Sequence, residues 1–268
     1  MISNEQIHIL DSILLGILQG VTEWLPVSSE GIVSVTYSLL LERPFSEAVA
    51  FALWLHIGTA FSAAVAFRKE ITALLRGILS KPPQTTRLLT YLIVSSVLSG
   101  LIGLPILIFL GNIQESFGIT SMGIVGAMML VTGGVLIRKS SSGYRNVNAV
   151  SAIDGVIAGT AQGIAALPGL SRSGLTISIL LARQVNHKTA LTLSFLMSIP
   201  ASLGSAIYIG YSEQITMSLE TIVASLVSFT VGLLTIKTIL AIAQRINTGA
   251  FVLCAGSAMI LGSILLHI

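Results

Sequence analysis

Six long apolar runs constrain this chain more than any other feature of its sequence. Each run is close to the roughly twenty residues that an α-helix needs to cross the hydrocarbon core of a membrane. A β-barrel would instead show short segments of alternating polarity. The sequence therefore predicts an all-α polytopic membrane protein with about six full transmembrane helices, at residues 48–67, 88–110, 119–137, 189–210, 221–243 and 249–267.

The composition excludes a soluble protein. Of the 268 residues, 53% are hydrophobic and 9% are charged, whereas soluble domains carry roughly 25% charged residues. The mean hydropathy is +0.92. The single cysteine, Cys254, excludes an intrachain disulfide, and the histidines are too scattered for a metal site built from His and Cys. The first charged side chains of the sequence, Glu5 and Asp11, are acidic, so we expect no signal peptide, whose first region is basic.

Two further apolar segments are interrupted. Residues 7–25 end at a proline and a polar turn, and a short apolar piece follows at 32–41. Residues 152–167 end at a Pro-Gly pair, and a short piece follows at 174–182. Each piece is short for a membrane crossing. We therefore expect two broken or re-entrant helical hairpins in addition to the full spans.

The basic residues predict the orientation of the chain. Loops rich in Lys and Arg lie on the cytoplasmic side of a membrane, and such residues occur near 68–87, 138–145, 183–188 and at Arg245. The remaining loops are acidic or neutral, with Glu42, Arg43, Glu47, Glu115, Glu213 and Glu220. The spans that follow the two interrupted segments then run in opposite directions. The sequence thus predicts one membrane domain, 1–268, made of two inverted-topology repeats at about 7–138 and 150–268.

Two polar stretches occupy matching places in these repeats. Gln19–Gly31 reads QGVTEWLPVSSEG and Gln162–Gly174 reads QGIAALPGLSRSG. Aligned without gaps, they share the glutamine and the glycine after it, a serine (Ser28 and Ser171) and the closing glycine. Because inverted repeats place broken helices near the bilayer midplane, we expect the two stretches to face each other inside the membrane.

Arg172 is the strongest indication of chemistry. An arginine deep in a membrane segment costs roughly 2.5–3.5 kcal/mol on insertion scales, so it is expected to pair with an anion. Ser171 and Ser173 add hydroxyl groups, and a helix beginning near Gly174 would direct its first N–H groups to the same place. This combination predicts a phosphate site. The alternatives are that Arg172 reaches the membrane interface or forms a structural pair with Glu23.

The two glutamates of the first stretch have several interpretations. Glu23 can hold a divalent cation, activate a water or a serine, or neutralise Arg172. One carboxylate is a weak metal site, but a carboxylate together with substrate phosphates is a common way to hold Mg²⁺. Glu30 can join Glu23 in this role or face water in the turn.

The serines and a histidine remain ambiguous. Ser28 or Ser29 can act as a nucleophile if a base lies within reach, or can cap the helix expected to begin near Gly31. His56, inside the apolar run 48–67, is interpreted as a packing residue.

The motifs closely resemble those of a known family. The segments GVTEWLPVSSEG, LHIGTAFSAAVAFRKE, LPGLSRSGLTIS and LSFLMSIPASLGSA are similar to the undecaprenyl-diphosphatase (UppP/BacA) family of lipid-carrier phosphatases, from about residue 10 to the C-terminus. The resemblance implies a plasma-membrane hydrolase that converts an undecaprenyl-type polyprenyl diphosphate to the monophosphate and phosphate. It also implies a site facing the external side, a Mg²⁺ or Ca²⁺ cofactor, and recycling of a lipid carrier for cell-envelope glycan synthesis.

Residues are assigned to this site from the motifs and the resemblance together. By position, the family's motif glutamate is Glu23, its active-site serines are Ser28 and Ser29, and its SRS stretch is 171–173 with Thr176 just beyond. We assign Glu23, Ser29 and Arg172 as catalytic, Glu23 also as a metal ligand, and Glu30 as a further catalytic or metal residue. The assigned substrate-binding residues are Ser28, Ser171, Ser173, Gly174 and Thr176.

Three positions depart from the family pattern. Gln19 stands where the family often has Glu, Glu30 where it usually has Ser or Thr, and Ile32 where it has a histidine. Because isoleucine cannot transfer a proton, Ser29 with Glu23 or Glu30 would carry that work. The alternatives are a polyprenyl-phosphate flippase, a small-anion transporter, or a protein that binds lipid carriers without cleaving them. The expected partners are the polyprenyl diphosphate and membrane lipids, with no nucleic acid.

Overall fold

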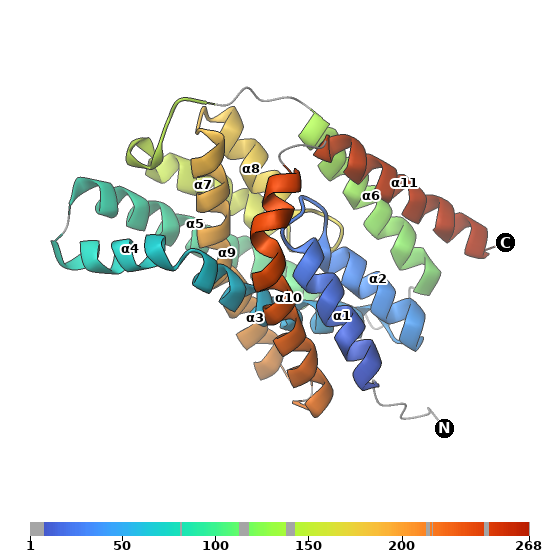
Figure 1. Cartoon of the computed structure of the whole chain (residues 1–268). Coiled ribbons are helices and arrows are strands. Elements are labelled where there is room, and N and C mark those ends of the chain that lie inside the picture. The colour runs from blue at the N-terminus through green and yellow to red at the C-terminus, as the bar shows by residue number, and fades with distance from the viewer. Residues whose placement is uncertain are drawn as a thin grey trace.

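The computed structural model is helical throughout the part of the chain that it describes, residues 8–80, 82–112, 118–137, 143–212, 215, 217–243 and 247–267 (Figure 1). The all-α prediction is therefore confirmed for these residues. Outside the α-helices, the described residues contain a single 3₁₀ turn, Val147–Ala149, and one isolated bridge between Arg145 and Val185. The α-helices are α1 (Ile9–Thr22), α2 (Ser29–Leu41), α3 (Phe45–Ala66), α4 (Arg68–Ser80), α5 (Pro83–Gly111), α6 (Gly118–Ile137), α7 (Ala152–Ile164), α8 (Arg172–Ala182), α9 (His187–Tyr211), α10 (Leu219–Ala243) and α11 (Thr248–His267).

Among the described residues, six helices are long and apolar enough to cross a membrane, as the sequence predicts. They are α3, α5, α6, α9, α10 and α11, and each begins and ends within five residues of its predicted range. The long apolar run is the signal that locates them, because a helix of about twenty residues spans the hydrocarbon core.

The interrupted segments form short helix pairs. Helix α1 ends at Thr22 and α2 begins at Ser29, while α7 ends at Ile164 and α8 begins at Arg172. The second helix of each pair has a serine N-cap whose hydroxyl accepts a backbone N–H bond, from Gly31 to Ser28 and from Gly174 to Ser171. A serine at this position satisfies one of the free N–H groups of the first turn. The capping is done by Ser28 and Ser171, so the side chains of Ser29 and Arg172, the first residues of α2 and α8, are not needed for it.

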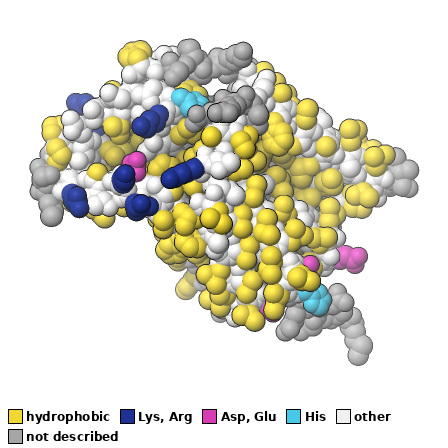
Figure 2. All heavy atoms as spheres, in the orientation of Figure 1, with side chains coloured by type: hydrophobic (Ala, Val, Ile, Leu, Met, Phe, Trp, Pro, Cys, Tyr) yellow, Lys and Arg dark blue, Asp and Glu magenta, His cyan; other side chains and the backbone are white. Residues whose placement is uncertain are grey.

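Helix α4 was missed by the sequence prediction, which gave residues 68–87 as a basic loop. Its side chains alternate between charged residues such as Lys69 and Glu70 and exposed apolar residues such as Leu75 and Ile78. This composition is too polar for a full span, so the search for long apolar runs does not detect it. Figure 2 shows Lys and Arg side chains gathered over this end of the molecule, where Arg68, Lys69, Arg76 and Arg87 are exposed.

Several charges used for the orientation lie outside the described residues, namely Lys81, Glu115, Arg138, Lys139, Glu213 and Arg245, as does Glu5, used for the signal-peptide expectation.

Helices from the two halves of the chain pack against each other through small residues. Helix α1 packs on α10, α7 packs on α5, and α6 packs on α11 (Figure 1). A Cβ atom at Gly20 would lie 2.8 Å from the backbone nitrogen of Gly232, and one at Gly159 would lie 2.6 Å from the carbonyl oxygen of Ser95. Glycine at such positions allows two helix backbones to approach closely. This packing brings the α1–α2 turn next to the α7–α8 turn.

Candidate active site

The two predicted polar stretches are in contact. Ser28 Oγ, at the start of α2, accepts hydrogen bonds from Gly31 N at 3.1 Å and from Gly169 N, in the other turn, at 3.0 Å. Gly169 has φ of +99°, a backbone conformation open to glycine and unfavourable for other residues. A Cβ atom on Gly31 would lie 2.9 Å from Gly169 N. Glycine is therefore required on both sides of this contact, which connects the halves of the chain.

Glu23 and Arg172 form an ion pair across these turns. Arg172 Nη2 donates to Glu23 Oε1, and Arg172 Nη1 lies 3.4 Å from Ser202 Oγ on α9. The Glu23 side chain is 6% exposed and that of Arg172 is 18% exposed. Glu23 directly follows α1 and Arg172 is the first residue of α8, so the pair lies where both short helices are interrupted.

The second carboxylate oxygen of Glu23 contacts three other polar side chains. Glu23 Oε2 accepts hydrogen bonds from Ser29 Oγ at 2.7 Å and from Gln19 Nε2 at 3.0 Å. His56 Nε2, on α3, lies 3.3 Å from the same oxygen. Gln19 thus serves as a hydrogen-bond donor that orients Glu23. Among the serines of the first stretch, Ser29 is the one with its hydroxyl on a carboxylate.

The remaining assigned residues divide into two groups. Ser28, Glu30 and Ser173 line the same cavity as Glu23, Ser29 and Arg172. Ser171, Gly174 and Thr176 are not among the residues that line it. Ser171 caps α8, with Gly174 N as its donor, and Thr176 Oγ1 lies 2.7 Å from Ser194 Oγ on α9. The structure therefore gives these last residues a role in holding α8 in place.

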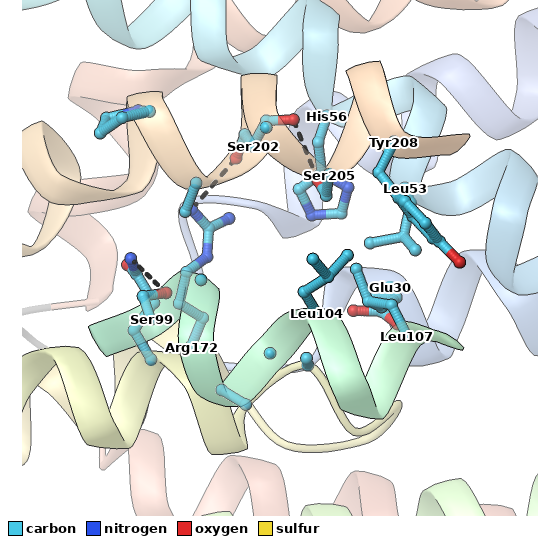
Figure 3. Close-up of a pocket in the computed structure, with 18 of the residues that line it drawn as sticks. Glu30, Leu53, His56, Ser99, Leu104, Leu107, Arg172, Ser202, Ser205 and Tyr208 are labelled. Atoms are coloured by element: carbon cyan, nitrogen blue, oxygen red, sulfur yellow. Dashed lines mark hydrogen bonds between the residues drawn. The ribbon is translucent and has the colours of Figure 1, made fainter. Parts of the chain in front are cut away.

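The cavity has a volume of about 510 Å³, and Figure 3 shows His56, Arg172 and Glu30 pointing toward the same space. Polar residues from both turns occupy one part of its wall. Most of the rest comes from α5 and α9, with apolar or small residues that include Gly100, Leu104, Leu107, Gly204 and Tyr208. The polar part of the cavity can bind an anion through a guanidinium and hydroxyl groups, and the apolar part can hold a hydrocarbon chain attached to that anion.

A divalent cation fits Glu30 better than Glu23. Both carboxylate oxygens of Glu23 are engaged by Arg172, Ser29 and Gln19. Glu30 Oε1 is buried and has no hydrogen-bond partner among the described residues. No cluster of three or more His, Cys, Asp and Glu side chains suited to a metal occurs in the described part of the chain. A cation at Glu30 would thus draw most of its ligands from a bound anion.

The structure places His56, which the sequence analysis interpreted as a packing residue, in the wall of the cavity. The side chain lines the cavity and its ring lies against the Glu23 carboxylate. Ile32, by contrast, packs in an apolar cluster with Val125 and Val252. An ionisable residue inside an apolar span was the available signal, because such residues are rare in membranes unless they serve a function.

A second polar group in the cavity wall contains Gln162, from the second predicted stretch, and serines that the sequence analysis missed because they are uncharged and distant in sequence. Gln162 Nε2 donates to Ser99 Oγ at 3.1 Å and to the carbonyl oxygen of Met197 at 3.2 Å. Ser99, Gln162 and Ser202 all line the cavity. Serines in apolar helices give no sequence pattern that distinguishes a cavity wall from a helix contact.

Comparison with known proteins identifies the family. The family model described as bacitracin resistance protein BacA matches residues 12–262. The chain is 36% identical over 258 residues to the undecaprenyl-diphosphatase of Methanococcoides burtonii, an alignment that covers 94% of this chain and 97% of the relative. It is 34% identical over 261 residues to that of Methanopyrus kandleri, with 96% of each chain covered. For the Haloarcula marismortui protein, also named undecaprenyl-diphosphatase, the identity is 34% over 267 residues, 96% of this chain and 98% of the relative. The chain is therefore a multi-pass membrane protein that belongs to the BacA family of undecaprenyl-diphosphatases.

Proposed function

We propose that this protein hydrolyses an undecaprenyl-type polyprenyl diphosphate to the monophosphate and inorganic phosphate, and so recycles a lipid carrier for cell-envelope glycan synthesis. One observation carries the proposal. Ser29, Glu23 and Arg172 meet at the polar part of a cavity whose other wall is apolar. A guanidinium recognises phosphate oxygens, and an apolar wall suits a prenyl chain. The names of the relatives support this substrate.

The headgroup is proposed to bind between the two turns. Arg172 would exchange part of its contact with Glu23 for the diphosphate, while Ser173 and Ser202, which line the same space, would donate hydroxyl hydrogen bonds. The prenyl chain would lie along α5 and α9, at Gly100, Leu104 and Gly204. This position accounts for a buried site, because a lipid substrate leaves the bilayer only at a high cost in free energy.

Ser29 is proposed as the nucleophile, since its hydroxyl already donates to a carboxylate at 2.7 Å. Ser29 Oγ forms a bond to the terminal phosphorus, and the bond from that phosphorus to the bridging oxygen breaks. The electron pair of the broken bond remains on the prenyl monophosphate, and the hydroxyl proton moves to Glu23 Oε2. Water then attacks the phosphorylated serine and releases phosphate. Arg172 stabilises the negative charge that the transferred group carries in each transition state.

A Mg²⁺ or Ca²⁺ ion is proposed to assist, held by Glu30 and the phosphate oxygens. The support is Glu30 Oε1 in the cavity wall, which is buried and has no hydrogen-bond partner in the part of the chain that the structure describes. Such an ion would neutralise charge on the bound diphosphate. Glu30 also lies in the first turn of α2, where backbone N–H groups favour an anion nearby.

Two inverted repeats with re-entrant hairpins are the proposed architecture of the site. The helix packing supports it, because the first helix of each repeat, α1 or α7, packs on a long helix of the other repeat, α10 or α5. The equivalent N-caps Ser28 and Ser171 support it as well. The proposed orientation places the site toward the external side of the plasma membrane. The cavity wall extends to Leu107 and Tyr211, near the C-terminal ends of α5 and α9, whereas the exposed basic residues of α4 lie next to the N-terminal end of α5.

Phosphate release from undecaprenyl or farnesyl diphosphate by the purified protein in detergent tests the proposal. Wild-type protein with Mg²⁺ or Ca²⁺ should release phosphate, and Arg172→Ala or Ser29→Ala should reduce kcat/KM by about 10³-fold or more. Arg87→Ala is the matched arginine control, since Arg87 is exposed and donates to the carbonyl of Asn148. Unchanged activity in both site variants would refute this site.

A translocator of polyprenyl phosphate is the second candidate. The packing of α1 on α10 and of α7 on α5 favours it, because inverted repeats around a midplane site are a common transporter architecture. Liposomes distinguish the two candidates. A translocator would move the lipid phosphate between leaflets without releasing phosphate, whereas the phosphatase releases phosphate whether or not the lipid crosses.

A further inference from the structure

His56 is held in one orientation inside the cavity wall. His56 is 6% exposed, and its Nδ1 lies 2.8 Å from the carbonyl oxygen of Ala52, one turn earlier on α3. A carbonyl oxygen accepts hydrogen bonds and cannot donate them, so Nδ1 carries a hydrogen. Nε2 is therefore the ring nitrogen that can gain or lose a proton on the side facing the site.

Nε2 faces the oxygen on which Ser29 depends. It lies 3.3 Å from Glu23 Oε2, which accepts the Ser29 hydroxyl at 2.7 Å. The charged groups near this ring are Glu23, Glu30 and Arg172. On α10, which packs on α3, the uncharged residues Ser225, Ser228 and Phe229 lie against Leu55 and Gly58, the neighbours of His56 along α3. With Nδ1 on the carbonyl of Ala52, the free ring nitrogen Nε2 is on the side of the ring that faces Glu23.

Glu23 by itself is a poor final acceptor for the serine proton. Its carboxylate is held in the ionised form by hydrogen bonds from Arg172, Gln19 and Ser29. Protonation would weaken each of these bonds. An imidazole against the same oxygen offers a place for the proton that leaves the Arg172 contact intact, because the proton can lie between Oε2 and Nε2.

We propose that His56 is the proton acceptor of this site and acts through Glu23. The inference rests on the proposed function. When Ser29 Oγ bonds to phosphorus and the prenyl monophosphate leaves, the hydroxyl proton passes to Glu23 Oε2 and on to His56 Nε2. The product of this step is a phosphoserine beside an imidazolium–carboxylate pair. When water attacks, one of its protons stays on the released phosphate, the other returns to Ser29 Oγ, and His56 gives up its proton to solvent.

The test uses His56→Gln and His56→Ala in the full-length protein, with His187→Gln as the histidine control at the start of α9. Phosphate release from farnesyl diphosphate is measured against pH, with and without added imidazole. His56→Gln should lower kcat by about 10²–10⁴-fold, the range for general acid–base groups, with KM within a few-fold of wild type. It should also remove the acidic limb of the kcat/KM profile. Imidazole should restore part of kcat in His56→Ala, because the missing ring leaves a space beside the cavity, and should not affect His187→Gln.

Each outcome decides between distinct conclusions. If His56→Gln retains kcat and the acidic limb, or if imidazole fails to raise kcat in a folded His56→Ala protein, His56 is not the acceptor while the phosphatase assignment stands. If wild-type protein releases no phosphate, the proposed function fails and the inference fails with it. A thermal unfolding curve of each variant separates loss of folding from loss of proton transfer.

Discussion

The ion pair between Glu23 and Arg172 predicts a separation of stability from activity. The variants are Glu23→Gln, Arg172→Met and the double substitution. Either single change leaves one charge without its partner in a poorly exposed site, 6% exposed at Glu23 and 18% at Arg172. Loss of one partner of a buried pair costs about 3–5 kcal/mol, whereas replacement of the whole pair is often close to neutral.

The expected magnitudes follow from this difference. Each single variant should lose about 3–5 kcal/mol of the free energy of unfolding. Glu23→Gln should fall at the lower end, because water can reach part of the Arg172 side chain. The double variant should lie within about 1 kcal/mol of wild type. All three should lose phosphate release, since Glu23 is proposed to accept the Ser29 proton and Arg172 to bind the diphosphate.

Unfolding in detergent can be followed by tryptophan fluorescence, and of the two tryptophans Trp24 directly follows Glu23 in the sequence. Its indole is buried, donates to the carbonyl of Gly232 and packs edge-to-face on Phe195, with ring centroids 5.5 Å apart. The reasoning is refuted if the double variant loses as much stability as the two singles together, because the charges would then not be coupled. It is also refuted if the double variant retains wild-type phosphate release.

Three further predictions test other parts of the site. Gly204→Leu should fold normally, because a Cβ atom there would meet nothing within 4 Å, and should raise KM for undecaprenyl diphosphate about tenfold or more. The control is Gly134→Leu, which is equally open on α6 but outside the cavity lining, and equal KM values for the two variants would contradict the proposed position of the prenyl chain. Glu30→Gln should raise the Mg²⁺ concentration needed for half-maximal activity by roughly tenfold, measured by titration after chelation, and an unchanged requirement would remove Glu30 from the metal site. Asp154→Asn should lower the free energy of unfolding by about 3–5 kcal/mol and leave kcat of the folded protein unchanged, because the fully buried Asp154 pairs with Arg145 and Arg183 at the start of α7, away from the cavity. A change in kcat at unaltered stability would contradict this purely structural role.

The sequence predicted the spans and the main contact for identifiable reasons. Runs of apolar residues report the thickness of a bilayer directly, so α3, α5, α6, α9, α10 and α11 appear near their predicted ranges. Arg172 and Glu23 were recognised because charges are costly in a membrane and need partners. Helix α4 escaped the prediction because its composition is that of a surface segment. The repeats, the re-entrant hairpins, the metal and the orientation remain proposals.

The part of the site that sequence could not supply depends on tertiary packing. Ser28 and Ser29 are adjacent and chemically identical, yet the start of α2 turns one hydroxyl to backbone N–H groups and the other to Glu23. His56 is thirty-three residues from Glu23 in the sequence and joins it because α3 passes beside the α1–α2 turn. The sequence by itself determined a helical membrane protein with one acidic and one basic motif that had to meet. The tertiary structure decided which side chains around that meeting share an oxygen, because hydrogen bonding depends on directions and distances that residue types alone do not specify.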